Sequence, residues 1–199
     1  MRMTVYLAVP RSMAPNGSTM LTPTGRPAPG EYSADVQPDI DRVEGDDAVA
    51  ALEAQGVRLC ALLDALDDAR VAGLTYAPGK WTLKEVVAHL ADDERIFAYR
   101  ILRVARGDRT PLPGFDEKLF ASTTGAEQRP LRDLVAEFRS VRAATLTLLR
   151  GLPREAWARW GFVNEYEATV RGLAFHVAGH ELRHVRALRE LYLNGRPGR

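Results

Sequence analysis

Four stretches of the chain carry apolar residues at three- and four-residue intervals, and this spacing constrains the fold more than any other feature. They cover residues 46–73, 82–106, 130–151 and 169–193. Such spacing places the apolar side chains on one face of an α-helix. No stretch shows the sustained apolar–polar alternation of half-buried strands. The sequence therefore predicts an all-α protein, a four-helix bundle with a common core.

The helix boundaries carry local signals. Thr82 and Glu85 have the spacing of a capping box, and Pro130 suits the first turn of the third helix. The connection between the second and third helices is about 20 residues long and punctuated by Pro and Gly. At about 3.3 Å per residue it can run the length of the bundle. We therefore expect a long crossover between helices 2 and 3.

Residues 1–40 have a different composition, rich in Pro, Gly, Ser and Thr and without a sustained period. We expect a disordered tail here, or sequence upstream of a true start at Met13 or Met20. The metal-binding four-helix domain described below would then cover residues 41–199.

Charge and cysteine content limit the classes of function. Lys and Arg total 27 against 26 for Asp and Glu, so the formal charge is +1. This balance argues against a dedicated nucleic-acid binder. No apolar run reaches the roughly 18 residues of a membrane span, and the first apolar run is too short for a secretory signal. The single cysteine, Cys60, fits a reducing compartment. We expect a cytoplasmic protein with no nucleic-acid or membrane partner.

Three of the four histidines fall on the apolar faces of predicted helices. His180 and His184 are four residues apart on the last helix, so they project together, and His89 faces the bundle axis from the second helix. Isolated core histidines with hydrogen-bonded partners are the alternative. However, three converging imidazoles would be hard to satisfy without a cation. The pattern predicts one divalent metal ion, Zn, Ni or Fe, bound by His89, His180 and His184.

The fourth histidine, His176, cannot share an ion with His184, because eight residues of helix separate them by about 12 Å. The chelating pair is either His176 with His180 or His180 with His184. The apolar seam of the helix favours the second pair. His176 is then expected near the ligands or at the surface.

Two carboxylates are candidate catalytic groups. His180 to His184 match H-E-x-x-H, in which Glu181 would be a general base. The sequence offers no third ligand at the metzincin spacing, and it predicts no sheet that could bind a peptide. Both points argue against a protease. Glu181 then remains a helix-surface charge or a neighbour of the ligands. Asp93, or Asp92, could orient His89 or accept a proton. Three protein ligands leave a position open, the catalytic pattern.

The segments GKWTLKEVVAHLADDERIFAYRILRVARGD, LPGFDE and LAFHVAGHELRHVRALREL resemble the DinB-like (YfiT-like) metalloenzyme family. The resemblance covers about residues 46–193. It implies a four-helix bundle with a crossover, a site at His89, His180 and His184, and a homodimer. Related subgroups include thiol-dependent S-transferases that use bacillithiol and mycothiol-dependent maleylpyruvate isomerases. The resemblance therefore makes a low-molecular-weight thiol a second candidate cofactor.

The sequence is compatible with three functions. The first two involve a small-molecule substrate. The first is a thiol-dependent S-transferase in detoxification or stress response, in which the metal lowers the pKa of a bound thiol. The second is a metal-dependent hydrolase with Asp93 or Glu181 as proton acceptor. The third is a non-catalytic dimer in which the ion is structural.

Overall fold

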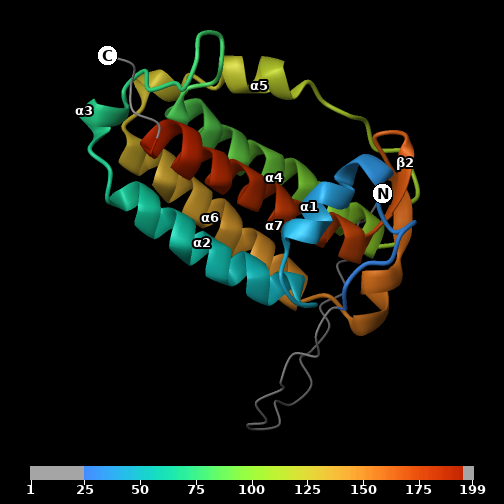
Figure 1. Ribbon diagram of the computed structural model, residues 1–199. Helices are drawn as coiled ribbons and strands as arrows, with labels where there is room; N and C mark the ends of the chain where they lie inside the picture. Colours follow the sequence, from blue (N-terminus) through green and yellow to red (C-terminus); the bar gives the residue numbers. More distant parts are fainter. Residues whose placement is uncertain (1–24, 195–199) are drawn as a thin grey trace, which may run out of the picture.

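The computed structural model describes residues 25–194, and four long helices form its body (Figure 1). They are α2 (Ala48–Asp64), α4 (Leu83–Ala105), α6 (Leu131–Arg150) and α7 (Val170–Ala187). The last helix continues as a π-helical segment, η4 (Leu188–Leu193). The predicted all-α four-helix bundle is confirmed. Within the described residues, no helix combines the length and apolar character needed to cross a membrane.

The remaining elements are short and lie at the ends and edges of the bundle. They are η1 (Ala34–Val36), α1 (Gln37–Arg42), α3 (Asp68–Val71), α5 (Glu117–Thr123), η2 (Ala126–Gln128), η3 (Arg154–Ala158), β1 (Trp160–Val163) and β2 (Tyr166–Thr169).

The helices begin where side chains satisfy their free backbone N–H groups. Thr82 Oγ1 accepts from the Glu85 backbone N–H at 3.2 Å, and the Glu85 carboxylate accepts from the Thr82 N–H at 2.8 Å. This is the predicted capping box of α4. Asp47 caps α2, and Thr169 caps α7 through the N–H of Gly172.

Helices α4 and α6 lie side by side and run in the same direction. Lys84 donates to the carbonyl of Arg129 near their first turns, and Glu94 pairs with Arg142 further along both helices. A parallel pair cannot be joined by a tight turn. The connection of residues 106–130, which contains α5, instead returns along the bundle (Figure 1). The predicted crossover is confirmed.

The bundle core is divided by a layer of buried polar side chains. One apolar cluster includes Leu52, Ile101 and Leu173, and the other includes Leu63 and Leu188. Along each helix the polar positions lie between the two clusters, namely Gln55 on α2, Asp93 and Glu94 on α4, Arg142 on α6, and His180 and Glu181 on α7. Buried polar groups need partners. The side chains of this layer therefore need hydrogen-bond or charged partners within the core.

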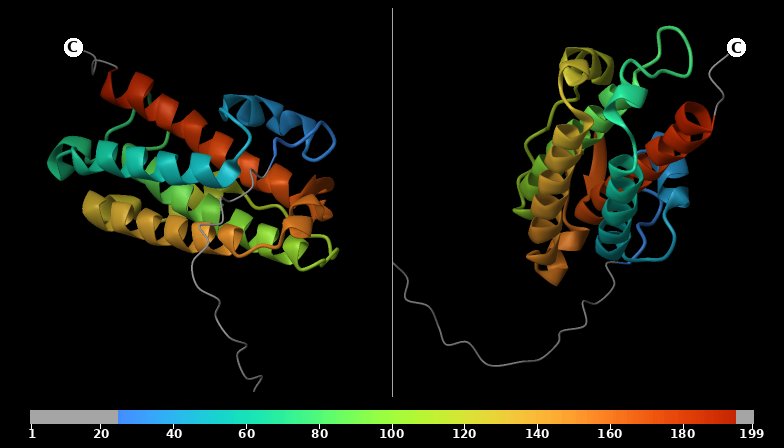
Figure 2. Two further views of the ribbon diagram at one scale, coloured as in Figure 1. Left: turned by 90° about the horizontal axis from the view of Figure 1, so that it is seen from below. Right: turned by 90° about the vertical axis from the view of Figure 1, so that its left-hand side faces the viewer.

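The prediction of a tail up to residue 40 is wrong for residues 25–40. Tyr32, Val36 and Ile40 are buried, and α1 packs on α7 (Figure 2). The contact is close because Gly179 has no side chain, and a Cβ there would lie 2.0 Å from the carbonyl oxygen of Asp39. The segment has no regular element longer than six residues, too short to show a helical period. The expectations for residues 1–24 lie outside the described residues.

The expectation of a chain without strands is also wrong. β1 and β2 form an antiparallel hairpin in which Val163 pairs with Tyr166. Asn164 and Glu165 form its turn with φ of 48° and 71°. Two residues with positive φ give the turn whose twist matches a hairpin. Strands of four residues are too short for an alternating pattern to stand out in the sequence.

Candidate metal centre

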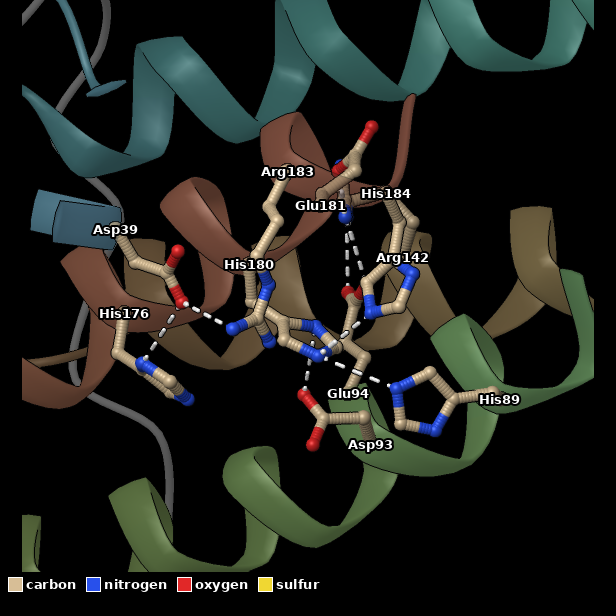
Figure 3. Close-up of polar contacts among 10 residues, drawn as sticks. All are labelled: Asp39, His89, Asp93, Glu94, Arg142, His176, His180, Glu181, Arg183 and His184. Atoms are coloured by element: carbon tan, nitrogen blue, oxygen red, sulfur yellow. Dashed lines mark hydrogen bonds and ion pairs between the residues drawn. The ribbon is translucent and has the colours of Figure 1, made fainter. Parts of the chain in front are cut away.

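Three imidazoles from α4 and α7 converge beside the polar layer. Nε2 of His180 lies 3.2 Å from Nε2 of His89 and 3.2 Å from Nε2 of His184 (Figure 3). One ring nitrogen from each of the three lies within 4.8 Å of the others. Ligands about 2.0–2.1 Å from a tetrahedral zinc ion lie roughly 3.3 Å apart. The spacing therefore fits a divalent ion, and among residues 25–194 this is the one such cluster of ligating side chains.

The environment of the three rings favours their neutral form, which is the form that can bind a metal ion. Burial lowers the pKa of His89 to about 4 and that of His184 to about 3. Burial also holds the pKa of His180 well below its usual value, and the neighbouring histidines add to the effect. Neutral imidazoles offer a lone pair, whereas protonated ones repel a cation.

Asp93 contacts the trio at His180. Its Oδ2 lies 3.3 Å from Nδ1 of His180. Burial, and then the charge of Glu117, raises the pKa of Asp93 to about 8. A cation at Nε2 would favour the ionised form of Asp93, which accepts from Nδ1–H and leaves the Nε2 lone pair free. The expectation that Asp93 orients His89, its neighbour on α4, is wrong, because the contact reaches across to the facing helix.

An aromatic residue packs against His89 and His184. The ring of Trp81 lies 4.8 Å from that of His89 and is nearly parallel to that of His184 at 6.3 Å. The hydroxyl of Tyr192 in η4 donates to the carbonyl of Trp81 at 2.8 Å. The segment before α4 and the end of the last helix thus hold Trp81 against His89 and His184.

Glu181 belongs to a buried ion-pair group rather than to the helix surface. Arg142 Nη2 lies 2.5 Å from Glu181 and 2.7 Å from Glu94, and Nη1 donates to the carbonyl of Leu52 at 2.6 Å. One guanidinium therefore links all four long helices. Burial raises the pKa of Glu181, and Arg142 opposes that shift.

The signal for this group was present but indirect. Arg142 follows Phe138 and precedes Thr145 at the spacing of the apolar face of α6, where a solvated arginine is not expected. Glu94 shares the buried face of α4 in the same way. The expectation of a surface position for Glu181 is corrected by its exposure of 2%.

His176 lies beside the trio but does not join it. Its ring is 5.8 Å from that of His180 and 4.5 Å from that of Phe97. Its Nδ1 is 3.9 Å from the buried carboxylate of Asp39 on α1, too far for a hydrogen bond (Figure 3). Of the two chelating pairs left open by the sequence, the geometry brings together His180 and His184.

Comparison with known proteins agrees with this architecture. The structure is similar to that of YfiT from Bacillus subtilis, described as a probable metal-dependent hydrolase with an unusual four-helix bundle topology. The TM-score is 0.66 at 21% sequence identity, covering 84% of this chain and 92% of YfiT. No curated protein matches the sequence. The family model of the DinB superfamily matches residues 51–188, most of the described chain. The chain therefore belongs to the DinB superfamily.

Proposed function

We propose that the protein is a metal-dependent hydrolase that acts on a small molecule at the trio of His89, His180 and His184. The observation that carries the proposal is the convergence of three neutral imidazoles with Nε2–Nε2 spacings of 3.2 Å. A ligand set of three protein groups is typical of catalytic sites, whereas structural zinc sites use four. The description of YfiT as a probable metal-dependent hydrolase supports the same class.

A divalent ion at this position supplies Lewis-acid activation of water or of a carbonyl group. His180, which lies within 3.2 Å of both His89 and His184, would hold it together with these two residues. Asp93 fixes the ring of His180, and Trp81 packs against the other two rings. We assign Asp93 the role of a positioning residue.

Glu181 is not favoured as a proton acceptor. Its carboxylate is bound by Arg142 in the bundle interior, and moving it toward a substrate would leave a buried guanidinium with one partner fewer. We infer that Glu181 fixes the position of α7, and with it the two ligands on that helix.

The thiol-dependent S-transferase is the second candidate, because the same open coordination position could take a thiolate. The cysteine of the chain itself does not compete for this role. Cys60 is buried, and burial raises the pKa of its thiol. A thiol substrate would therefore come from outside the chain. We further propose a homodimer, as the family resemblance implies.

Elemental analysis of the purified protein tests the site. We expect about one equivalent of a divalent metal in the wild type and in His176→Ala, and loss of the metal in His89→Ala and His180→Ala. A wild type without metal that also fails to bind added Zn, Ni or Fe refutes the proposal.

Two activity assays separate the candidate reactions. A hydrolase releases nitrophenol from 4-nitrophenyl esters, and this activity disappears on chelation and in His180→Ala. An S-transferase consumes a low-molecular-weight thiol in the presence of an epoxide or a chlorinated aromatic. Metal-loaded protein that consumes thiol but hydrolyses no ester overturns the hydrolase in favour of the transferase. A bound metal with neither activity leaves the non-catalytic dimer.

A further inference from the structure

Arg183 places a positive charge at the rim of the histidine trio. It precedes His184 on α7, and its side chain is 48% exposed. In Figure 3 it extends past His180 toward Asp39. It follows His180 by three residues on α7, so the two side chains occupy neighbouring positions on the helix surface.

The guanidinium of Arg183 has hydrogen-bond donors to spare. Its Nη1 lies 3.7 Å from Asp39 Oδ2, longer than a hydrogen bond, and this is its one ion pair within the described part of the chain. Asp39 already accepts a hydrogen bond from Arg42 at 2.9 Å, so its charge is shared. Asp39 therefore orients the Arg183 side chain but does not occupy all of its N–H donors.

A second cation lies deeper on the same side. Arg100 on α4 is 3% exposed and stacks its guanidinium over the ring of Phe97 at 4.7 Å. It donates to the carbonyl of Pro113 at 2.8 Å, but no carboxylate lies within ion-pair distance of it in residues 25–194. Buried charges normally have a counter-charge. His176 packs between this cluster and the trio, with its ring 4.5 Å from that of Phe97 and 5.8 Å from that of His180.

We propose that the substrate carries a carboxylate or similar anionic group, which Arg183 binds beside the histidine trio. Arg183 makes the contact through its planar, two-pronged array of N–H donors, which matches a carboxylate. Arg100 is buried, so it contributes only the attraction of its positive charge and makes no direct contact with the substrate. This inference rests on the proposed function, because it places the reacting bond of the substrate at the trio and its charged group at Arg183.

Calorimetric titration of zinc-loaded protein tests this assignment without relying on turnover. The probes are malonate, succinate and glutarate, each compared with its monomethyl ester, so that one carboxylate is kept and the second charge is removed. For the dicarboxylate whose length fits, we expect about tenfold tighter binding than for its ester, the effect of roughly one charge-assisted hydrogen bond. The ratio should fall to near one in Arg183→Gln.

Arg186→Gln is the matched control, because Arg186 lies on the same helix but is paired with Glu190 and exposed to solvent. It should keep the wild-type ratio. Equal binding of diacid and ester in the wild type, an unchanged ratio in Arg183→Gln, or no binding of any probe to zinc-loaded protein overturns the inference alone. Protein that does not take up zinc or another divalent metal overturns the inference together with the proposed function.

Discussion

The carboxylate of Asp93 on α4 lies 3.3 Å from Nδ1 of His180 on α7, and the opposite nitrogen of that ring faces the other two histidines. Asp93 thus fixes the His180 ring at Nδ1, and this leaves Nε2 directed toward His89 and His184. This contact connects the polar layer of the core to the candidate metal centre, and the first prediction follows from it.

Asp93→Ala should weaken metal binding by about 10–100-fold, because His180 loses the group that fixes its tautomer and orientation. Competition with a chromophoric chelator measures the affinity. Asp92→Ala is the control, since Asp92 pairs with Arg95 near the surface and does not contact a histidine. Equal affinities for the two variants would show that the contact of Asp93 with His180 does not matter for binding.

Metal binding should raise the melting temperature. An ion at a thousand times its dissociation constant stabilises the native state by about 4 kcal/mol, which for a chain of this size corresponds to roughly 10 °C. A chelator should reverse the shift. His184→Ala, which removes one ligand, should show little response to either addition. Scanning calorimetry provides the measurement, and a wild type indifferent to metal contradicts the prediction.

Arg142→Met should lower the free energy of unfolding by about 3–5 kcal/mol, because Glu94 and Glu181 remain buried without their cation. Arg139→Ala is the control on the same helix. Arg139 pairs with Asp64 at the surface, so its loss should cost less than about 1 kcal/mol. Urea unfolding measures both changes. Combining Arg142→Met with Glu94→Gln and Glu181→Gln should recover much of the loss.

The deficit of Arg142→Met should also depend on pH. Burial raises the pKa of Glu181 above the usual 4.5 even with Arg142 present, and removal of Arg142 takes away the largest effect that opposes this shift. The native state then binds more protons than the unfolded chain, so stability falls as pH rises through the window above 4.5. Urea unfolding should therefore show a smaller deficit at pH 4.5 than at pH 7. A deficit constant over this range would mean that the loss is one of packing.

Gly179→Ala should displace α1 from α7, because the added methyl group would meet the backbone of Asp39 at 2.0 Å. Overpacking of this kind costs about 1–3 kcal/mol. Limited proteolysis should cleave the segment of residues 25–45 faster in this variant. Gly151→Ala, at the end of α6, meets neighbours at ordinary contact distance and should behave as the wild type.

The sequence predicted the bundle and the convergence of the three histidines for the same reason. Helical periodicity fixes which residues share a face, so His180 and His184 had to project together and His89 had to face the axis. The capping box at Thr82 and Glu85 was equally local, and it formed as expected. Features that depend on residues within one helical turn were predictable.

Most features that depend on which side chains of distant segments pair with one another were not. Asp93 was expected to act on His89, four residues away, but its partner stands on another helix. The pairing of Glu181 with Arg142 joins residues 39 positions apart, and the apolar face on which Arg142 lies indicates its burial but not its partner. The packing of α1 on α7 depends on a glycine crossing rather than on a long apolar period. In each case the missing information was which helix faces which.

The parallel arrangement of α4 and α6 has a consequence for how the protein acquires its ion. It requires a long crossover within the 91 residues that separate His89 from His180, so their encounter closes a loop that includes the crossover and α6. The other two ligands need only one turn of a nascent helix. We expect the ion to bind first to His180 and His184, and then to His89 when α4 packs against α7. Ion binding would then stabilise the product of the last long-range step of folding.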